Sequence, residues 1–166
     1  MYAGLLFDFI ADKATNTVTI TREFAAQLTL VWDAFTKQEI LDQWGAPEPW
    51  TTKTKYMNFE PGGRRFFAMC GPDGQEHWSI YDFTSISPKT NFKYISGFSD
   101  KDENINQEFY GSENSVDFNE ANGITTVRQT IKYKTAAILE MMVERGFRQG
   151  VGMTFNNLDK LLATLS

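Results

Sequence analysis

The sequence is poor in the side chains that bind metals or form disulfides. Its 166 residues include one cysteine, Cys70, and one histidine, His77. A single cysteine excludes an internal disulfide and is too few for a cysteine-based zinc site. A zinc centre needs three or four ligands, and only His77 offers an imidazole nitrogen. We therefore predict no metal site, and no cofactor.

Basic residues are also few. The chain has 16 lysines and arginines against 21 acidic residues, so its net charge is −5, and the basic residues are scattered along the sequence. Domains that bind nucleic acid or anionic membrane surfaces carry clustered basic residues. We predict neither kind of partner.

Long apolar runs are missing as well. No stretch is long enough to span a bilayer. The N-terminus, MYAGLLFDFIADK, has no basic region, and Asp8 interrupts its apolar residues, so it does not resemble a signal peptide. A cytoplasmic protein is the resulting expectation.

Aromatic residues, by contrast, are abundant. They make up 14% of the chain, with 14 Phe, 6 Tyr and 4 Trp. Hydrophobic residues reach 42% and charged residues 22%, a composition typical of a folded domain. So many rings indicate either a large core or a cavity with apolar walls.

The periodicity of the chain predicts an α+β fold with an antiparallel sheet. Alternation and turn residues such as Asn122-Gly123 predict seven strands, over residues 17–25, 51–59, 63–71, 75–86, 91–98, 114–120 and 124–133. Two short helices, LTLVWDAFT and KQEILDQWG, follow the first strand, with a capping box of Thr36 and Glu39 and a C-cap at Gly45. The polar connection 99–113 is the segment we expect to be most mobile.

The C-terminal thirty residues are predicted to be helical. We expect two pieces, about 136–145 and 147–165, because the glycines near residue 150 weaken the start of the second helix. This long helix carries an apolar stripe that the sheet can bury, which leaves a cleft between them. Residues 16–166 form a single domain in this prediction.

Residues 1–15 form an apolar N-terminal extension. Leu5, Phe7 and Phe9 are among its apolar side chains, and Leu28 and Leu30 add apolar surface to the first helix. The extension therefore packs on that helix, in its own or a neighbouring subunit, or it forms a strand or turn that covers a sheet edge. The first alternative includes a homodimer.

The stretch FEPGGRRFFAMCGPDGQEH, residues 59–77, contains glycines, the cysteine and the histidine. It is not a phosphate loop, because its glycines lead into a strand and no helix with Lys and Ser/Thr follows. Cys70 and His77 flank a turn and could face each other across a hairpin. A buried thiol and a partly exposed hairpin histidine are favoured over a nucleophile pair, since no residue is placed to orient the imidazole.

Three predicted strands each place a set of side chains on one face. Arg65 shares a face with Phe67 and Met69. His77, Ser79, Tyr81 and Phe83 share another, and Gln129 lies among Thr125, Val127, Ile131 and Tyr133. Arg65 could hold a carboxylate or enolate, with Gln129, Tyr81 or His77 fixing its orientation. Alternatively, Arg65 reaches solvent and Gln129 bonds to a neighbour.

Several of these segments occur in the order found in a known family. ITREFAAQLTLVWDAFTKQEILDQWGAP, FEPGGRRFFAMCGPDGQEH, SISPKTNFKY and GFRQGVGMTFNNLDKLLATL resemble START-related helix-grip proteins grouped with the C-terminal domain of the activator of the ninety-kilodalton heat-shock-protein ATPase. The likeness covers about residues 16–165. Arg65 departs from the pattern, because the family usually has an aromatic residue there.

The resemblance implies a helix-grip fold with a deep apolar cavity between the long helix and the sheet. It implies no shared set of catalytic residues. We assign Trp44, Arg65, Phe67, Met69, His77, Tyr81, Phe83, Gln129 and Met153 to this cavity.

Three functions follow as hypotheses. The first is binding of a small apolar or aromatic ligand, anionic if Arg65 contacts it. The second is an enzyme, cyclase- or hydrolase-like, with His77 or Tyr81 as acid or base beside Arg65. The third, implied by the resemblance alone, is stimulation of a chaperone ATPase.

Overall fold

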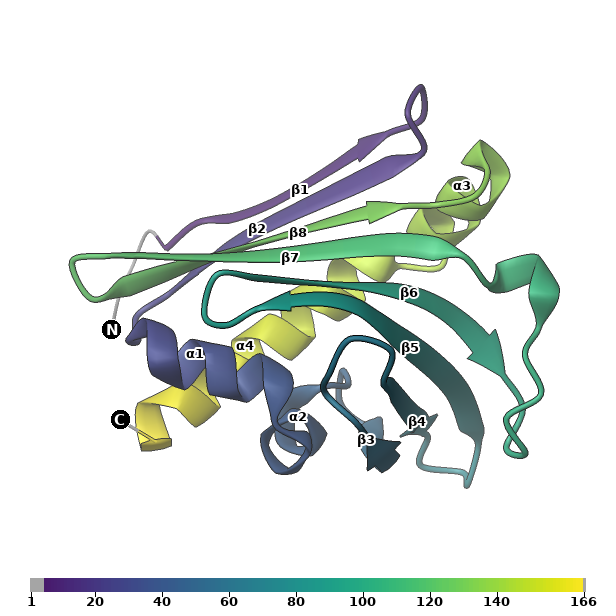
Figure 1. Ribbon diagram of the computed structural model, residues 1–166, viewed down its shortest axis with the longest axis horizontal. Helices are drawn as coiled ribbons and strands as arrows, with labels where there is room; N and C mark the ends of the chain where they lie inside the picture. The colour runs from purple at the N-terminus through teal and green to yellow at the C-terminus, as the bar shows by residue number, and fades with distance from the viewer. Residues whose placement is uncertain (1–4, 166) are drawn as a thin grey trace.

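The computed structural model describes residues 5–165 and contains a single antiparallel sheet with four α-helices (Figure 1). The strands are β1 (Phe7–Asp12), β2 (Thr17–Phe24), β3 (Thr51–Met57), β4 (Arg64–Cys70), β5 (Glu76–Ser87), β6 (Asn91–Ser99), β7 (Ser112–Ala121) and β8 (Ile124–Lys132). The helices are α1 (Leu28–Thr36), α2 (Gln38–Trp44), α3 (Ala136–Glu144) and α4 (Phe147–Leu165), with a short 3-10 turn, η1, at Gln107–Phe109.

The strands follow the order β1-β2-β8-β7-β6-β5-β4-β3, so the two edges are β1 and β3. The sheet curls without closing, and α4 lies across its concave side (Figure 1). The predicted α+β helix-grip architecture is confirmed, including the break between α3 and α4. The turn at Asn122-Gly123 has positive φ at both residues, 56° and 80°, as its sequence predicts.

The extra strand, β1, lies in the N-terminal extension. It pairs with β2 along the sheet edge, and the Phe9 ring lies 5.7 Å from the Phe147 ring at the start of α4. The predicted count of seven strands is therefore corrected to eight. The described part of the extension covers a sheet edge, the second of the two expected arrangements, while residues 1–4 lie outside the described residues.

The junction of α1 and α2 differs from the prediction. The Thr36 hydroxyl donates a hydrogen bond to a carbonyl four residues earlier, at 2.8 Å, and Lys37 is the N-cap of α2 without a side-chain capping bond. The predicted capping box of Thr36 and Glu39 is therefore wrong. Gly45 does end α2, and a Cβ there would lie 2.9 Å from Thr52 Cγ2, so glycine lets α2 pack closely on β3.

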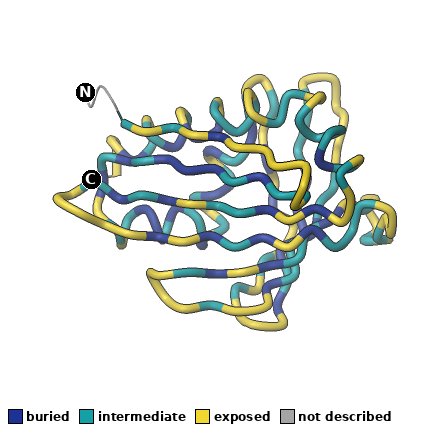
Figure 2. The backbone as a smooth tube through the Cα atoms, turned by 90° about the horizontal axis from the view of Figure 1, so that it is seen from above, coloured by how far each residue is buried: buried dark blue, intermediate teal, exposed yellow. Residues whose placement is uncertain are grey.

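The core lies between the concave face of the sheet and α4. Phe155, Leu158 and Leu162 are the buried apolar positions of α4, and the Phe155 ring contacts the Phe24 ring edge-on at 5.7 Å. Along strands such as β3 and β7, buried positions alternate with more exposed ones (Figure 2). Burial of one face of each element therefore holds α4 against the sheet.

A polar network ties the connection between β6 and β7 to the outer face of the sheet. Arg64 donates to both carboxylate oxygens of Asp82, at 2.6 and 3.1 Å, and to Glu103 at 3.1 Å. The Tyr110 hydroxyl donates to Asp82 at 2.6 Å. The mobility of this connection remains a prediction.

We expect the Tyr110 hydrogen bond to make stability depend on alkaline pH. Burial, followed by the bond to Asp82, raises the pKa of Tyr110 to about 12. A raised folded-state pKa gives stability that is complete below the unfolded pKa of about 10 and is lost as the pH rises to about 12. In Tyr110→Phe, the free energy of unfolding should fall less steeply as the pH rises through this range. The reason is that unfolding then releases up to one proton fewer than in the wild-type protein. Urea unfolding at several pH values measures this, and an unchanged slope would contradict it.

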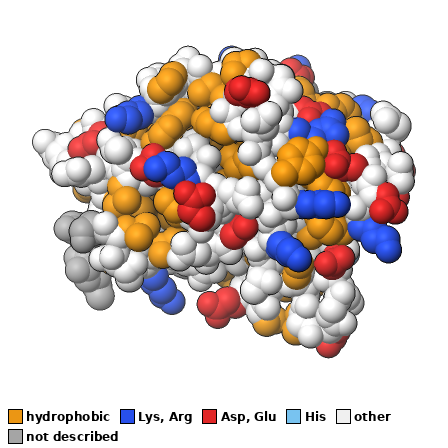
Figure 3. Space-filling model, turned by 60° about the horizontal axis from the view of Figure 1, so that its bottom comes forward, with side chains coloured by type: hydrophobic (Ala, Val, Ile, Leu, Met, Phe, Trp, Pro, Cys, Tyr) orange, Lys and Arg blue, Asp and Glu red, His pale blue; other side chains and the backbone are white. Residues whose placement is uncertain are grey.

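Charges of both signs are interspersed over the face drawn in Figure 3, without a broad area of one sign. On this face, the scatter of basic residues expected from the sequence is retained after folding. Within residues 5–165, none of the helices has the length and apolar character needed to cross a bilayer.

Candidate functional site

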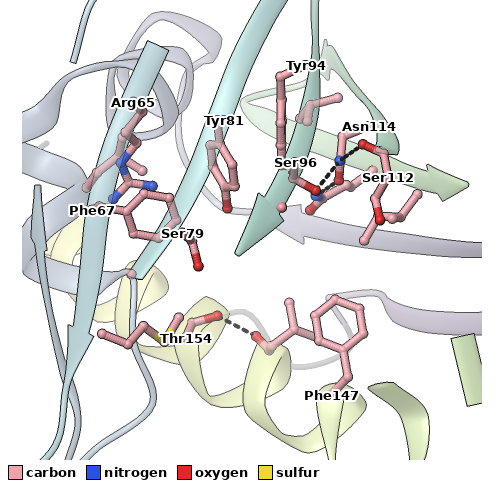
Figure 4. A pocket seen from close by; sticks show the side chains of 18 of the residues that line it. Arg65, Phe67, Ser79, Tyr81, Tyr94, Ser96, Ser112, Asn114, Phe147 and Thr154 are labelled. Carbon is pink, nitrogen blue, oxygen red and sulfur yellow. Dashed lines mark hydrogen bonds between the residues drawn. The ribbon is translucent and has the colours of Figure 1, made fainter. Parts of the chain in front are cut away.

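A cavity of about 430 Å³ lies between the sheet and the two C-terminal helices. The α4 side consists of Phe147, Gly150, Val151, Thr154 and Phe155, whose spacing of three or four places them on one helix face. Strands β4 to β8 supply the facing wall (Figure 4). A Cβ built on Gly150 has no atom within 4 Å, so space remains open beside the helix backbone there.

The structure brings most of the predicted cavity residues together. The predicted residues that line the cavity are Trp44, Arg65, Phe67, Met69, His77, Tyr81, Phe83 and Gln129. Met153 does not line it, and its side chain is 44% exposed. One residue rotates an α-helix by about 100°, so Met153 points away from the face that carries Thr154.

His77 lies at the exposed end of the cavity, where its ring is 5.4 Å from the Trp50 ring. Across the hairpin it pairs with Met69, whereas Cys70 pairs with Glu76. The expected placement of Cys70 opposite His77 is therefore wrong by one residue, and one residue turns a side chain to the other face of a sheet.

Arg65 is buried inside the fold rather than extended to solvent. Its side chain is 4% exposed, and the guanidinium lies over the Phe67 ring, 3.8 Å from the centroid (Figure 4). Nε donates to Thr54 Oγ1 at 3.2 Å, and Thr54 in turn donates to Asp42 at 2.7 Å. Burial lowers the pKa of Arg65, and nearby Tyr81 and Asp42 oppose that shift. Arginine nevertheless stays protonated in proteins, so the site holds a buried positive charge.

A second group of polar side chains lies across the neighbouring strands. Gln129 donates to the Tyr94 hydroxyl at 3.0 Å and to Asn114 Oδ1 at 3.3 Å. Asn114 in turn donates to Ser96 at 2.9 Å (Figure 4). Burial, then the neighbouring Tyr81, raises the pKa of Tyr94 well above its ordinary value. This group therefore stays neutral, and Gln129 has the neighbouring partners that the alternative interpretation expected.

Tyr94, Ser96 and Asn114 were missed as site residues from the sequence. A signal was present, because Phe92, Tyr94 and Ser96 occupy every second position of β6 and therefore share one face of the strand. In the same way, Asn114 shares a face of β7 with the residues two positions before and after it. These strands look like ordinary half-buried strands until the sheet is known to curl around α4.

The cavity contains one formal charge. Within residues 5–165, Arg65 is the only lysine, arginine, aspartate or glutamate that lines it. His77, four strand positions along from Tyr81, lies about 13 Å from the Arg65 end at about 3.3 Å per residue, so it is not beside the guanidinium. Among residues 5–165, no three His, Cys, Asp or Glu side chains gather where they could hold a metal ion. The arrangement can bind a ligand, and of the two residues considered as acid or base beside Arg65, Tyr81 is the one that lies near it, with its ring 5.5 Å from the guanidinium carbon.

A comparison with known protein families identifies the family of this chain. Residues 25–163 match the family described as activator of Hsp90 ATPase homolog 1-like protein. The chain belongs to this family. The predicted resemblance is thereby confirmed, and proteins of this fold commonly bind hydrophobic ligands.

Solved structures agree with the fold. The chain is similar to protein Ms6760 from Mycobacterium smegmatis, with 28% identity, a TM-score of 0.87, and coverage of 98% of this chain and 99% of that one. It also resembles a protein from Arthrobacter aurescens, with 22% identity, a TM-score of 0.88, and coverage of 95% and 91%. An AHSA1 protein from Silicibacter pomeroyi gives 20% identity, a TM-score of 0.68, and coverage of 90% and 99%. No curated protein matches the chain.

Proposed function

We propose that this protein binds a small, largely apolar molecule in the cavity between α4 and the sheet. The cavity itself carries the proposal: its volume of about 430 Å³ lies in the range of small-molecule sites, roughly 300–1,000 Å³. Its walls are mostly aromatic and aliphatic, with a few polar side chains on the sheet side. Small-ligand sites have this composition, because apolar walls supply affinity and the polar groups fix orientation.

The structure of the cavity walls supports ligand binding rather than catalysis. Aromatic rings such as Phe83 and Phe92 pack against one another, 6.3 Å apart, and so form a fixed surface. In the polar group around Gln129, the amide side chains do not titrate, and burial raises the pKa of Tyr94 well above its ordinary value, so this group supplies no acid or base near neutral pH. The exposed His77 lies away from Arg65, which weakens the acid–base role considered for it.

Native mass spectrometry of the freshly purified protein, compared with its denatured mass, tests the proposal. We expect either a retained small molecule or, for a ligand lost during purification, an empty cavity that takes up the neutral fluorescent dye N-phenyl-1-naphthylamine. Dye fluorescence should saturate at one dye per protein chain. A bare mass together with no saturable dye binding would overturn the proposal. Turnover in the cavity and stimulation of a chaperone ATPase would then be the functions to assay.

A further inference from the structure

The guanidinium of Arg65 has hydrogen-bond donors that no described residue accepts from. Of its three nitrogens only Nε donates to a protein atom, and Nη2 is a buried nitrogen without a hydrogen-bond partner among residues 5–165. A buried donor of a charged group that lacks an acceptor is costly in free energy, more so than the unpaired donor of a neutral group. The unused donors on this side chain therefore indicate a missing acceptor.

Asp42 does not supply that acceptor. Its Oδ1 lies 3.8 Å from Arg65 Nη2, beyond hydrogen-bond distance, and its oxygens instead accept from the backbone N–H and hydroxyl of Thr54. Thr54 holds Nε of the guanidinium in place, and Asp42, which accepts from Thr54, lies nearest to Nη2. The Phe67 and Tyr81 rings lie 3.8 and 5.5 Å from the guanidinium carbon, within the range of cation–π contact, and neither residue accepts a hydrogen bond from Arg65.

We infer that the ligand carries a carboxylate that binds the free donors of Arg65, an inference that rests on the proposed function. A planar carboxylate accepts two parallel hydrogen bonds from the planar guanidinium fork. A singly charged group also matches the charge available, because Arg65 is the only lysine or arginine among the described residues that line the cavity, and Asp42 already offsets part of its charge. A doubly charged phosphate would leave an uncompensated negative charge in an apolar site.

The neighbouring side chains indicate how the rest of this ligand lies. From Arg65 the inward face passes to Tyr81 on β5, then to Tyr94 on β6, whose ring is 4.1 Å from the Tyr81 ring. Figure 4 shows Phe67 below the guanidinium and Tyr81 beside it, with α4 opposite. A carboxylate at Arg65 therefore places its attached apolar body between these rings and α4. The ligand class is an aromatic or similarly apolar monocarboxylic acid.

A matched pair of probes tests the charge alone. 2-Naphthoate and 2-naphthamide have nearly the same shape and differ in the charge of the head group, and each competes with the bound neutral dye. In wild-type protein we expect naphthoate to bind on the order of 10- to 100-fold more tightly, as for hydrogen bonds to charged groups. In Arg65→Met the naphthoate affinity should fall to that of the amide, with near-ultraviolet circular dichroism reporting whether the fold is kept.

A second variant leaves Arg65 in place. Asp42→Asn removes the competing negative charge but keeps an oxygen that can accept from Thr54, so naphthoate should bind a few-fold more tightly and naphthamide unchanged. This variant keeps the test decisive if Arg65→Met does not fold. Equal affinity of the two probes for wild-type protein that binds the dye would overturn the carboxylate inference alone. Failure of the dye and both probes to bind would overturn the proposed function with it.

Discussion

Replacing Gly150 with phenylalanine is expected to abolish binding of the neutral dye while the protein stays folded. Gly150 lies on the α4 face that lines the cavity, between Phe147 and Thr154, and a Cβ there meets no atom within 4 Å. A phenyl ring at this position occupies the space that a ligand would use. The dye can then no longer bury its apolar surface there, which removes about 3 kcal/mol of binding free energy and weakens binding roughly 100-fold or more.

The same substitution should not lower stability, because glycine inside a helix is itself unfavourable by about 0.5–1 kcal/mol relative to alanine. Urea unfolding of Gly150→Ala measures how much stability is gained by replacing the helix glycine alone, with little loss of cavity volume. Gln149→Phe adds the same ring at the adjacent exposed position and should leave dye affinity unchanged. Wild-type affinity in Gly150→Phe would show that the dye binds elsewhere and would contradict the cavity as the ligand site.

Local patterns in the sequence predicted most of the fold correctly because each signal acts within a few residues. The hairpin at Asn122-Gly123 follows from two residues that tolerate positive φ, and the break before α4 follows from Gly146, whose φ is 87°. Strand β1 was expected only as one of two arrangements of the N-terminal extension, because its alternation is short. Its pairing is decided by the neighbouring edge of β2, which no local pattern reports.

The candidate site was only partly predictable. The period of two placed Arg65 and Phe67 on the inward face of one strand, and the structure lines the cavity with both. The partners of Arg65 come from β3 and α2, elements brought to it by tertiary packing, so neither Thr54 nor Asp42 could be assigned from sequence distance. The burial of Arg65 likewise depends on how the sheet curls, since a residue near a strand end more often reaches solvent.

Leu158→Ala is expected to lower the free energy of unfolding by about 3 kcal/mol, within the usual 2–5 kcal/mol for such a change. Leu158 is fully buried on α4, at 0% exposure, and does not line the cavity. Truncation removes apolar contacts and leaves a void that the surrounding side chains fill only in part. Urea unfolding with an unchanged m-value measures the loss as a shift in midpoint.

Leu165→Ala is the matched control, since this leucine ends the same helix and is 44% exposed. It should cost less than about 1 kcal/mol, because little area is removed from the interior. Equal costs for the two variants would contradict the packing of α4 against the sheet.

The two halves of α4 therefore have separable roles. Its first half, from Phe147 to Phe155, faces the cavity, and its second half, with Leu158 and Leu162, is buried in the core. Gly150→Phe should then remove binding without loss of stability, whereas Leu158→Ala should lower stability and, in the protein that remains folded, leave dye affinity unchanged. A helix anchored at one end can leave space beside its other end, which is how a well-packed domain can also keep a cavity open for a ligand.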